Sequence, residues 1–395
     1  MKKAITILLI FLSFKAIVFI IYLAYEHLPV QLIHFEHFAI EDVEFNDIFY
    51  ATHEERFTDT KAVVLINTGS IPYDDRFREA LAALIEKTAR FHPACIGIDF
   101  TFEKHKNPLF DSTLQATISR YPNIVLAIDK NNANKQIFHG ANRGLVNFPE
   151  KTGESIRHCF NFVIHGKDTI PSFALQLARF NNKSIVAEDS VCYLKYSSDR
   201  KGYYDFINDV DNKINPLNFA AVEAGDLMND TDTSRIRSLL NNKIVIIGHL
   251  GDETMHNAFD IKDKFRVPND TTLINRAFVM PGAVIHANAA QMLLENDTFF
   301  EVKGWLNTLV TSLILIVFLY IFYTLHHRFI LGKAMNLLII LGCTIPIIYI
   351  CCVLLMVAGI YYKVGALFMQ IAFLEEFIEV ADGFRKKFTK KSAHD

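Results

Sequence analysis

The chain has 395 residues, of which 51% are hydrophobic and 21% are charged, and its formal net charge is −3 at pH 7. Single cores usually stop growing at about 250 to 300 residues, so this length allows one sizeable core plus membrane spans. The hydrophobic fraction is high for a soluble protein, which indicates that the chain contains clustered apolar segments. The small negative charge provides no basic field and argues against a nucleic-acid partner.

The chain begins with an apolar run, Ile5 to Tyr25, that is interrupted by Ser13 and Lys15. The run is long enough to cross a hydrocarbon core about 30 Å thick. A cleaved signal peptide is the alternative, but the run exceeds a usual signal core and bulky residues follow it. We therefore predict a first transmembrane helix within residues 1–26.

Two further apolar runs, Trp305 to Leu325 and about Ala334 to Ile360, lie near the C-terminus. Both are long enough to cross a membrane, so we predict spans at residues 304–326 and 334–360. A shorter run, Val364 to Leu374, precedes a cluster of glutamates and is too brief by itself.

The distribution of positive charge decides how we interpret the short run, because basic segments stay on the cytoplasmic side of a membrane. Basic clusters lie at the N-terminus, between the second and third spans, and in the tail: Lys2, Lys3, Arg328, Lys333, Arg385, Lys386, Lys387, Lys390 and Lys391. A fourth helix at about residues 361–384 puts all of them on one side. We therefore predict four spans, a cytoplasmic tail at 385–395, and an outer domain at 27–303.

Lys15 lies near the middle of the first span, where a charge costs about 2.5 to 3.5 kcal/mol and needs a partner or a route to water. Glu375 and Glu376 are candidate partners in the fourth span. The alternative is that Lys15 extends toward the inner membrane surface while the glutamates mark the end of an interfacial helix.

The first half of the outer domain alternates strand and helix patterns. Short apolar runs predict strands at residues 61–68, 95–102 and 123–129, and helical periodicity predicts helices at 75–91 and 109–121. Strands separated by helices of this length favour a parallel sheet. From 131 to 165, turn residues and short strand patterns at 144–148 and 160–166 indicate an antiparallel insertion.

The second half of the outer domain returns to the alternating pattern. We expect helices at 170–180, 219–227, 234–240 and 281–294, and strands at 191–197 and 243–251. The last strand has four apolar residues in a row followed by Gly248, and such a run needs cover on both faces, so we place it at the centre of the sheet. The predicted fold is α/β, with a mixed, largely parallel sheet flanked by helices in three layers.

Several of these segments together resemble a known family. They are VVLINTGSIP, ACIGIDFTF, NIVLAID, PSFALQLA, NKIVIIGHLG and MPGAVIHANAAQMLL. Over Lys61 to Asp297 the chain is similar to the CHASE domain of the second type, CHASE2, an extracytoplasmic sensory domain with one span before it and three after it. The resemblance implies a bacterial inner-membrane protein that receives signals for kinases, cyclases or related outputs.

The chain departs from the family pattern in two ways. A short basic tail follows the last predicted span, so we expect the output to pass through a partner protein or a homo-oligomer. In the first strand the family often has an Asp where this sequence has Asn67, which puts in doubt any ligand chemistry that needs a carboxylate there.

Polar residues at strand ends are the candidate ligand-binding residues, because ligands of open α/β sheets bind beyond the carboxyl ends of the strands. The candidates are Asn67, Asp99, Asp129 and His249, to which we add Asp252 and His286. The alternative is that they cap helices or satisfy loops. His286 and Asn288 are two residues apart on a helix, so they are poor joint metal ligands.

No catalytic, metal or cofactor motif appears in the sequence. The HExxH, CxxC, Walker and GxGxxG patterns are all missing, and Gly69-Ser70 lacks the second glycine of a nucleophile elbow. We therefore expect no enzyme activity, cofactor or metal. Cys95, Cys159 and Cys192 have no paired spacing, and a disulfide between two of them stays an open alternative.

Three hypotheses follow from the sequence. The first is a membrane-anchored sensory module that binds a small-molecule or protein ligand. The second is a structural subunit of an envelope complex. The third is an extracytoplasmic enzyme that uses Asp99 and His249.

Overall fold

The computed structural model describes residues 10–16, 62–132, 135–150, 154–166, 168–187, 189–196, 219–251, 264–268, 279–326, 342, 346, 350–351, 353–362, 367, 370–371 and 378. The chain divides into two compact units. One unit is Tyr50–Phe299, and the other combines Met1–Phe49 with Phe300–Asp395.

The first unit is organised around a six-stranded sheet with the order β4-β3-β2-β10-β1-β9. The strands are β1 (Val63–Asn67), β2 (Cys95–Ile98), β3 (Ile124–Ile128), β4 (Asn142–Leu145), β9 (Ala220–Glu223) and β10 (Ile244–Gly248). Every neighbouring pair in this sheet is parallel. All residues of β1, β2, β3 and β10 are buried, as expected for strands covered on both faces.

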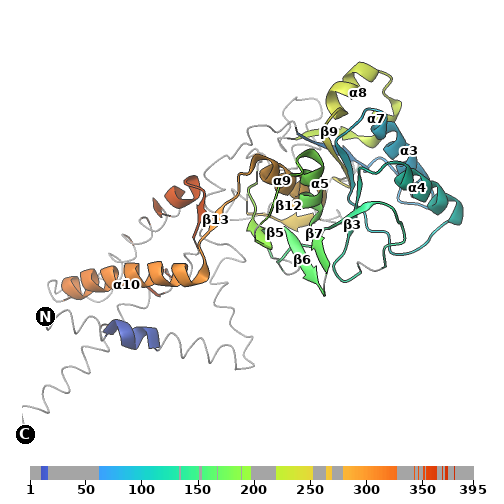
Figure 1. Ribbon diagram of the computed structural model, residues 1–395. Coiled ribbons are helices and arrows are strands. Elements are labelled where there is room, and N and C mark those ends of the chain that lie inside the picture. The colour runs from blue at the N-terminus through green and yellow to red at the C-terminus, as the bar shows by residue number, and fades with distance from the viewer. Residues whose placement is uncertain are drawn as a thin grey trace, which may run out of the picture. The chain divides into compact units, whose positions relative to one another are not determined.

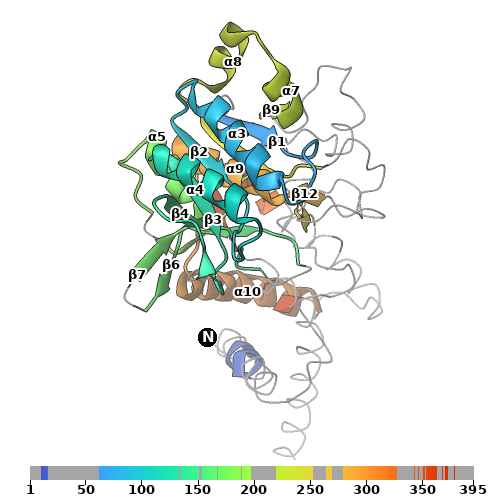
Figure 2. The ribbon, with the colours of Figure 1, turned by 90° about the vertical axis from the view of Figure 1, so that its right-hand side faces the viewer.

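Helices cover both faces of this sheet, as Figure 1 shows. One face carries α3 (Phe77–Ala89), α4 (Pro108–Arg120), α7 (Ala224–Asn229) and α8 (Thr233–Leu240). The other face carries α5 (Phe173–Asn181) and α9 (Gly282–Glu295). Figure 2 views the sheet from the side of α3 and α4. The predicted three-layer arrangement with a largely parallel sheet is therefore present in this unit.

Alternate residues of each central strand supply the two cores, because side chains of a strand point to opposite faces. In β1, Val63 and Leu65 pack toward α5 and α9, whereas Val64 and Ile66 pack toward α3 and α4. Strand β10 lies between β1 and β2, with Val63 opposite Ile244. The strand predicted at 243–251 is therefore central.

Two expectations from the sequence need correction. The segment 219–227 was expected to be helical, but residues 220–223 form β9 and the helix begins at Ala224. These residues bond to the open edge of β1, which outweighs their local preference. The strand expected at 144–148 as part of an antiparallel insertion is β4, which pairs parallel to β3 and extends the central sheet.

Antiparallel pairing occurs in small two-stranded ribbons outside the central sheet. Strand β5 (His158–Phe160) pairs with β8 (Val191–Tyr193), and β6 (Phe162–His165) pairs with β7 (Asp168–Pro171). A third ribbon joins β11 (Lys264–Arg266) to β12 (Val279–Pro281). The antiparallel character predicted for part of 131–165 therefore resides in these ribbons.

The second unit contains α10 (Gly304–His326), whose stretch Gly304–Thr324 has a mean hydropathy of 2.1 and is long and apolar enough to cross a membrane. This is the one such helix among the residues that the structure describes. Leu315, Leu319 and Phe322 on α10 pack with Ile10 and Phe14 of the predicted first span. Most residues of the spans predicted at 334–360 and 361–384 lie outside the described ranges.

A short parallel pair joins the ends of two predicted membrane segments in this unit. Strand β13 (Phe300–Glu301), just before α10, pairs with β14 (Ile360–Tyr361). The hydroxyl groups of Thr311 and Tyr362 lie 2.5 Å apart and form a buried hydrogen bond. The chain therefore returns at residue 360 to the end of α10 where that helix begins.

Candidate functional site

The carboxyl edge of the central sheet gathers four of the predicted site residues. Strand β1 ends at Asn67, His249 follows β10, Asp99 follows β2, and Asp129 follows β3. Because all these strands are parallel, their carboxyl ends lie at the same edge. Asn67, His249 and Asp99 come from adjacent strands, while Asp129 comes from a strand one position further out.

Asn67 is buried and connects the loops after β1 and β10 to the end of β9. Its side-chain Nδ2 donates to Glu223 Oε1 at 2.7 Å and to the Gly251 carbonyl at 2.9 Å. Its Oδ1 accepts from the backbone N–H of Gly69 at 3.0 Å and of Leu250 at 2.8 Å. An aspartate could not donate the two Nδ2 bonds, so the amide at this position joins the loops after β1 and β10 to the end of β9.

The loops after β1 and β10 touch each other directly. A Cβ added to Gly69 would lie 1.9 Å from the Gly251 carbonyl oxygen, which leaves no room for a side chain. Thr68 reinforces the contact, since its backbone N–H donates to the Gly248 carbonyl at 3.0 Å. The loops after β1 and β10 therefore close the sheet edge at this point.

Asp129 also has a local structural role. Its Oδ1 accepts from the backbone N–H of Asn131 at 2.8 Å, and its Oδ2 accepts from Asn147 Nδ2 at 2.8 Å. These bonds fix the turn after β3 against the segment after β4. These contacts fit the alternative given in the sequence analysis, in which Asp129 satisfies a loop and does not bind a ligand.

His286 lies in the core and is not at the sheet edge. Its ring stacks on Phe148 at a centroid distance of 5.0 Å and meets Phe173 edge-on at 5.4 Å. Burial lowers the pKa of His286 to about 3, so the imidazole is neutral at physiological pH. Asn288 donates back to the Val284 carbonyl of its own helix at 2.9 Å.

The remaining predicted residues are Asp252, Glu375 and Glu376, which lie outside the described residues. Lys15 donates a hydrogen bond to Gln370 Oε1 at 2.8 Å, so its partner among the described residues comes from the segment predicted as the fourth span. No group of three or more His, Cys, Asp or Glu residues able to hold a metal occurs within the described ranges.

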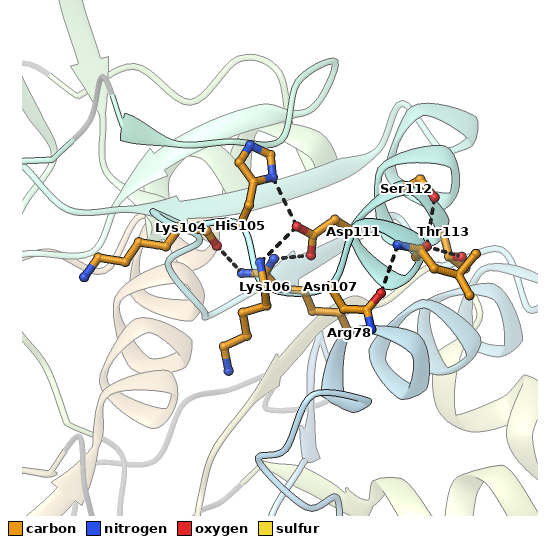
Figure 3. Close-up of polar contacts among 9 residues, drawn as sticks. Arg78, Lys104, His105, Lys106, Asn107, Asp111, Ser112 and Thr113 are labelled. Carbon is orange, nitrogen blue, oxygen red and sulfur yellow. Dashed lines mark hydrogen bonds and ion pairs between the residues drawn. The ribbon is translucent and has the colours of Figure 1, made fainter.

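A buried ion pair beside the loop after β2 was missed by the sequence reasoning (Figure 3). Arg78 of α3 pairs with Asp111 of α4, and both side chains are almost fully buried. Arg78 also donates to the Lys104 carbonyl at 2.6 Å. Asp111 accepts from the Lys106 backbone N–H at 3.1 Å and contacts His105 Nδ1 at 3.1 Å.

The ion pair ties α3 and α4 to the loop after β2. Burial by itself would raise the pKa of Asp111, but the bonds from Arg78, the Lys106 backbone and His105 outweigh burial and lower it. Arg78 also lies 5.6 Å from the Phe102 ring centroid and 5.5 Å from that of Phe138. The one signal in the sequence was a cation next to Phe77, on the apolar face of a helix.

Comparison with known proteins supplies the family. Searches of curated proteins and of solved structures found no match. The model of the CHASE2 domain matches residues 17–323, which is most of the chain and more than the Lys61–Asp297 range of the sequence resemblance. CHASE2 domains are extracytoplasmic sensory domains. By this match, the chain belongs to the CHASE2 domain family.

Proposed function

We propose that this protein is a membrane-anchored sensory module. Its outer domain binds a ligand, and the resulting structural change passes through α9 to α10. The observation that carries the proposal is the burial of α9: every residue from Gly282 to Leu293 is buried. From the end of this helix the chain reaches the apolar helix α10 through residues 296–303. A shift at the sheet therefore reaches the membrane segment along a continuous backbone.

The close packing of α9 on the sheet supports this route. A Cβ added to Gly248 at the end of β10 would lie 2.7 Å from the Ala283 Cβ in the first turn of α9. The same Cβ would lie 3.4 Å from the Asp99 Cβ. Because packed elements have little free volume, a ligand that moves the ends of β2 and β10 would also move α9.

The segment that follows α9, residues 296–299, makes several contacts within the same unit. Asn296 ends the helix in a left-handed conformation with φ 52°. Lys195, which follows β8, donates to Asp297 Oδ1 at 2.6 Å and lies 4.5 Å from the Phe299 ring centroid. The Tyr193 and Phe299 rings meet edge-on at 5.5 Å. The segment that leads to the membrane is thus tied to the β5–β8 ribbon.

The membrane arrangement in this proposal has four spans, both termini in the cytoplasm and the main domain outside the inner membrane. The β13–β14 pairing supports two crossings between residues 304 and 360, because the chain comes back to the end of α10 where it started. Exposed apolar side chains on α10 suit lipid or a partner helix; they are Trp305, Leu309, Leu313, Val317, Tyr320 and Ile321. In this proposal a partner protein or a second copy carries the output.

The ligand site in this proposal is the sheet edge around Asp99 and His249, and the site has no catalytic role. To test it, the full-length protein in detergent is screened by thermal unfolding against fractionated extracellular metabolites. A ligand at about 100 times its Kd adds about 2.7 kcal/mol, so the midpoint should rise. The rise should shrink in Asp99→Asn and His249→Gln and persist in Asp129→Asn.

Two outcomes would contradict ligand sensing. A stoichiometric protein partner in native membranes, with no ligand shift, would favour a structural subunit of an envelope complex. Turnover of a substrate that disappears in Asp99→Asn would favour an extracytoplasmic enzyme.

The orientation has its own test. Ala116 is exposed on α4, so an impermeant maleimide added to intact cells should label Ala116→Cys. The same reagent should label Lys391→Cys, in the basic tail, only after the cells are permeabilised. Labelling in the reverse pattern would overturn the proposed membrane arrangement.

A further inference from the structure

Two cysteines that are far apart in the sequence face each other across the β5–β8 ribbon. Cys159 of β5 and Cys192 of β8 are direct partners in the antiparallel register. Their Sγ atoms are 3.2 Å apart. Antiparallel partners have Cα atoms about 4.5 to 5.5 Å apart, which falls inside the range of about 4.4 to 6.8 Å seen in disulfides. The backbone geometry therefore permits a disulfide without rearrangement of the strands.

The two thiols differ in exposure and in hydrogen bonding. Cys159 is 4% exposed, whereas Cys192 is only partly buried. The Asn161 Nδ2 donates to the Asp189 carbonyl at 2.9 Å, which turns Oδ1 toward Cys192. Cys192 donates to that Oδ1 at 3.3 Å, so the proton in the contact between the thiols comes from Cys159.

The environment of Cys159 agrees with this assignment. Its hydrogen bond with Cys192 and its burial raise the pKa of Cys159 well above the ordinary value. A protonated, buried thiol is a poor first nucleophile. Cys192 is therefore the sulfur that an external disulfide reaches first, and Cys159 is placed to attack second.

We propose that Cys159 and Cys192 form a thiol–disulfide exchange site that is oxidised by a low-molecular-weight disulfide on the extracytoplasmic side. The Cys192 thiolate attacks one sulfur of that compound, forms a mixed disulfide and releases one small thiol. Cys159 then attacks the Cys192 sulfur, closes the protein disulfide and releases the second small thiol. Two protein thiols lose two electrons, and the two thiol protons go to the released thiols.

The site lies where a covalent bond has structural consequences. The segment after β8 bonds back to the residues before β5, since the Leu194 N–H donates to the Arg157 carbonyl at 2.8 Å. The Tyr196 hydroxyl donates to the Ile156 carbonyl at 2.7 Å. Lys195 between them pairs with Asp297. A disulfide would therefore restrict the motion of the ribbon that contacts the segment after α9.

The compartment favours this chemistry, because disulfides persist in extracytoplasmic proteins. The proposal depends on the outer location of the domain, but it does not depend on a ligand at the sheet edge. Failure of the ligand screen would leave it intact, and failure of disulfide formation would leave ligand sensing intact.

The test uses the full-length, reduced protein in detergent with oxidised glutathione as the probe. After acid quenching and alkylation, trypsin releases each cysteine on its own peptide: His158–Lys167 carries Cys159 and Ser184–Lys195 carries Cys192. We expect these two peptides to be joined in the oxidised sample and separated by a reductant. Complete alkylation of both thiols after exposure to glutathione disulfide would overturn the proposal.

Single variants test the order of attack and guard against misfolding. In Cys159→Ser, glutathione should accumulate on Cys192. In Cys192→Ser, glutathione disulfide should modify Cys159 roughly tenfold more slowly, because that thiol is buried and protonated. Equal modification of both variants would contradict the assigned order. Cys95→Ser is the matched control, since Cys95 is buried in β2 and should not alter the cross-link.

A second readout does not depend on peptide chemistry. Oxidised wild-type protein should show slower amide exchange over residues 191–196 than reduced protein, and a higher thermal midpoint. Both differences should vanish in either single variant while Cys95→Ser keeps them. Identical exchange in the two redox states of the wild type would overturn the structural consequence.

Discussion

The two faces of the central sheet bury polar groups in different ways. The face under α3 and α4 buries a full charge pair, Arg78 with Asp111, whose remaining bonding capacity is met by loop groups. The face under α5 and α9 buries an uncharged imidazole, that of His286, between two aromatic rings. Arg78 and Asp111 are therefore stabilised by charge pairing, whereas His286 is stabilised by staying uncharged.

The faces also differ in how closely the helices approach the strands. A Cβ added to Gly97 or Gly144 would collide with α5, and one added to Gly248 would collide with α9. The opposite face fills the gap with large side chains such as Leu81, Leu84 and Ile85. The sheet therefore meets α5 and α9 at glycines, whereas it meets α3 and α4 through large side chains.

The largest expected effect is on the charged face. Arg78→Met should lower the free energy of unfolding by about 3 to 5 kcal/mol, because it leaves the Asp111 carboxylate buried without its cation. Arg76→Met is the matched control: Arg76 is 72% exposed in its pair with Glu79, so its loss should cost about 0 to 1 kcal/mol. Denaturant unfolding of the detergent-solubilised protein measures both. Equal losses of stability in the two variants would contradict the contrast between a buried and an exposed ion pair.

The next effect is on the closely packed face. Gly144→Ala should cost about 1 to 3 kcal/mol, near the upper end, because the new Cβ would lie 2.4 Å from the Phe173 Cα. Gly97→Ala should cost less, since its Cβ would meet the side-chain tips of Phe173 and Leu177 at 2.8 and 2.9 Å. The same unfolding measurement ranks the two. A larger loss for Gly97→Ala would show that backbone contact is not what limits this face.

Acid should destabilise the two faces in different pH ranges. The unfolded His286 has the ordinary pKa of about 6.5, while its folded pKa is about 3. Between these values the unfolded state binds more protons, so stability falls as the pH falls, by about 2 kcal/mol from pH 6.5 to 5. His286→Phe keeps the stacking and should abolish this slope.

The charged face responds at lower pH. The pKa of Asp111 is lowered in the folded state, so its contribution is complete above the unfolded value of about 3.9 and is lost below it. Unfolding midpoints measured from pH 7 to 3 distinguish the two ranges. An unchanged slope between pH 6.5 and 5 in His286→Phe would show that another group carries the acid response.

The smallest expected effects are at helix caps, one on each face. Ser172 Oγ accepts from the Leu175 N–H at 3.1 Å at the start of α5, and Asn107 Oδ1 accepts from the Leu109 N–H at 3.0 Å at the start of α4. Ser172→Ala and Asn107→Ala should each cost about 1 kcal/mol. Ser172 is buried and Asn107 is not, so a loss at Ser172 no greater than at Asn107 would mean that burial adds nothing to this cap.

The candidate site was predicted only in part. Apolar strands flanked by helices indicated a parallel sheet, and this topology is enough to bring Asn67, Asp99 and His249 to one edge. The bonding of Asn67 to Glu223 depends on β9, which was expected to be helical. The position of His286 inside the core depends on Phe148 and Phe173, which no local pattern connects to it.

The sequence by itself determined the elements marked by a continuous apolar run or by apolar periodicity, such as β1, α3, β10 and α9, because these patterns record which residues are covered. Only the tertiary structure decided which polar groups meet. Cys159 and Cys192 are separated by 33 positions, and Arg78 and Asp111 also by 33. Contacts of this kind depend on strand register and helix packing, which hydrophobic patterns along the chain do not specify.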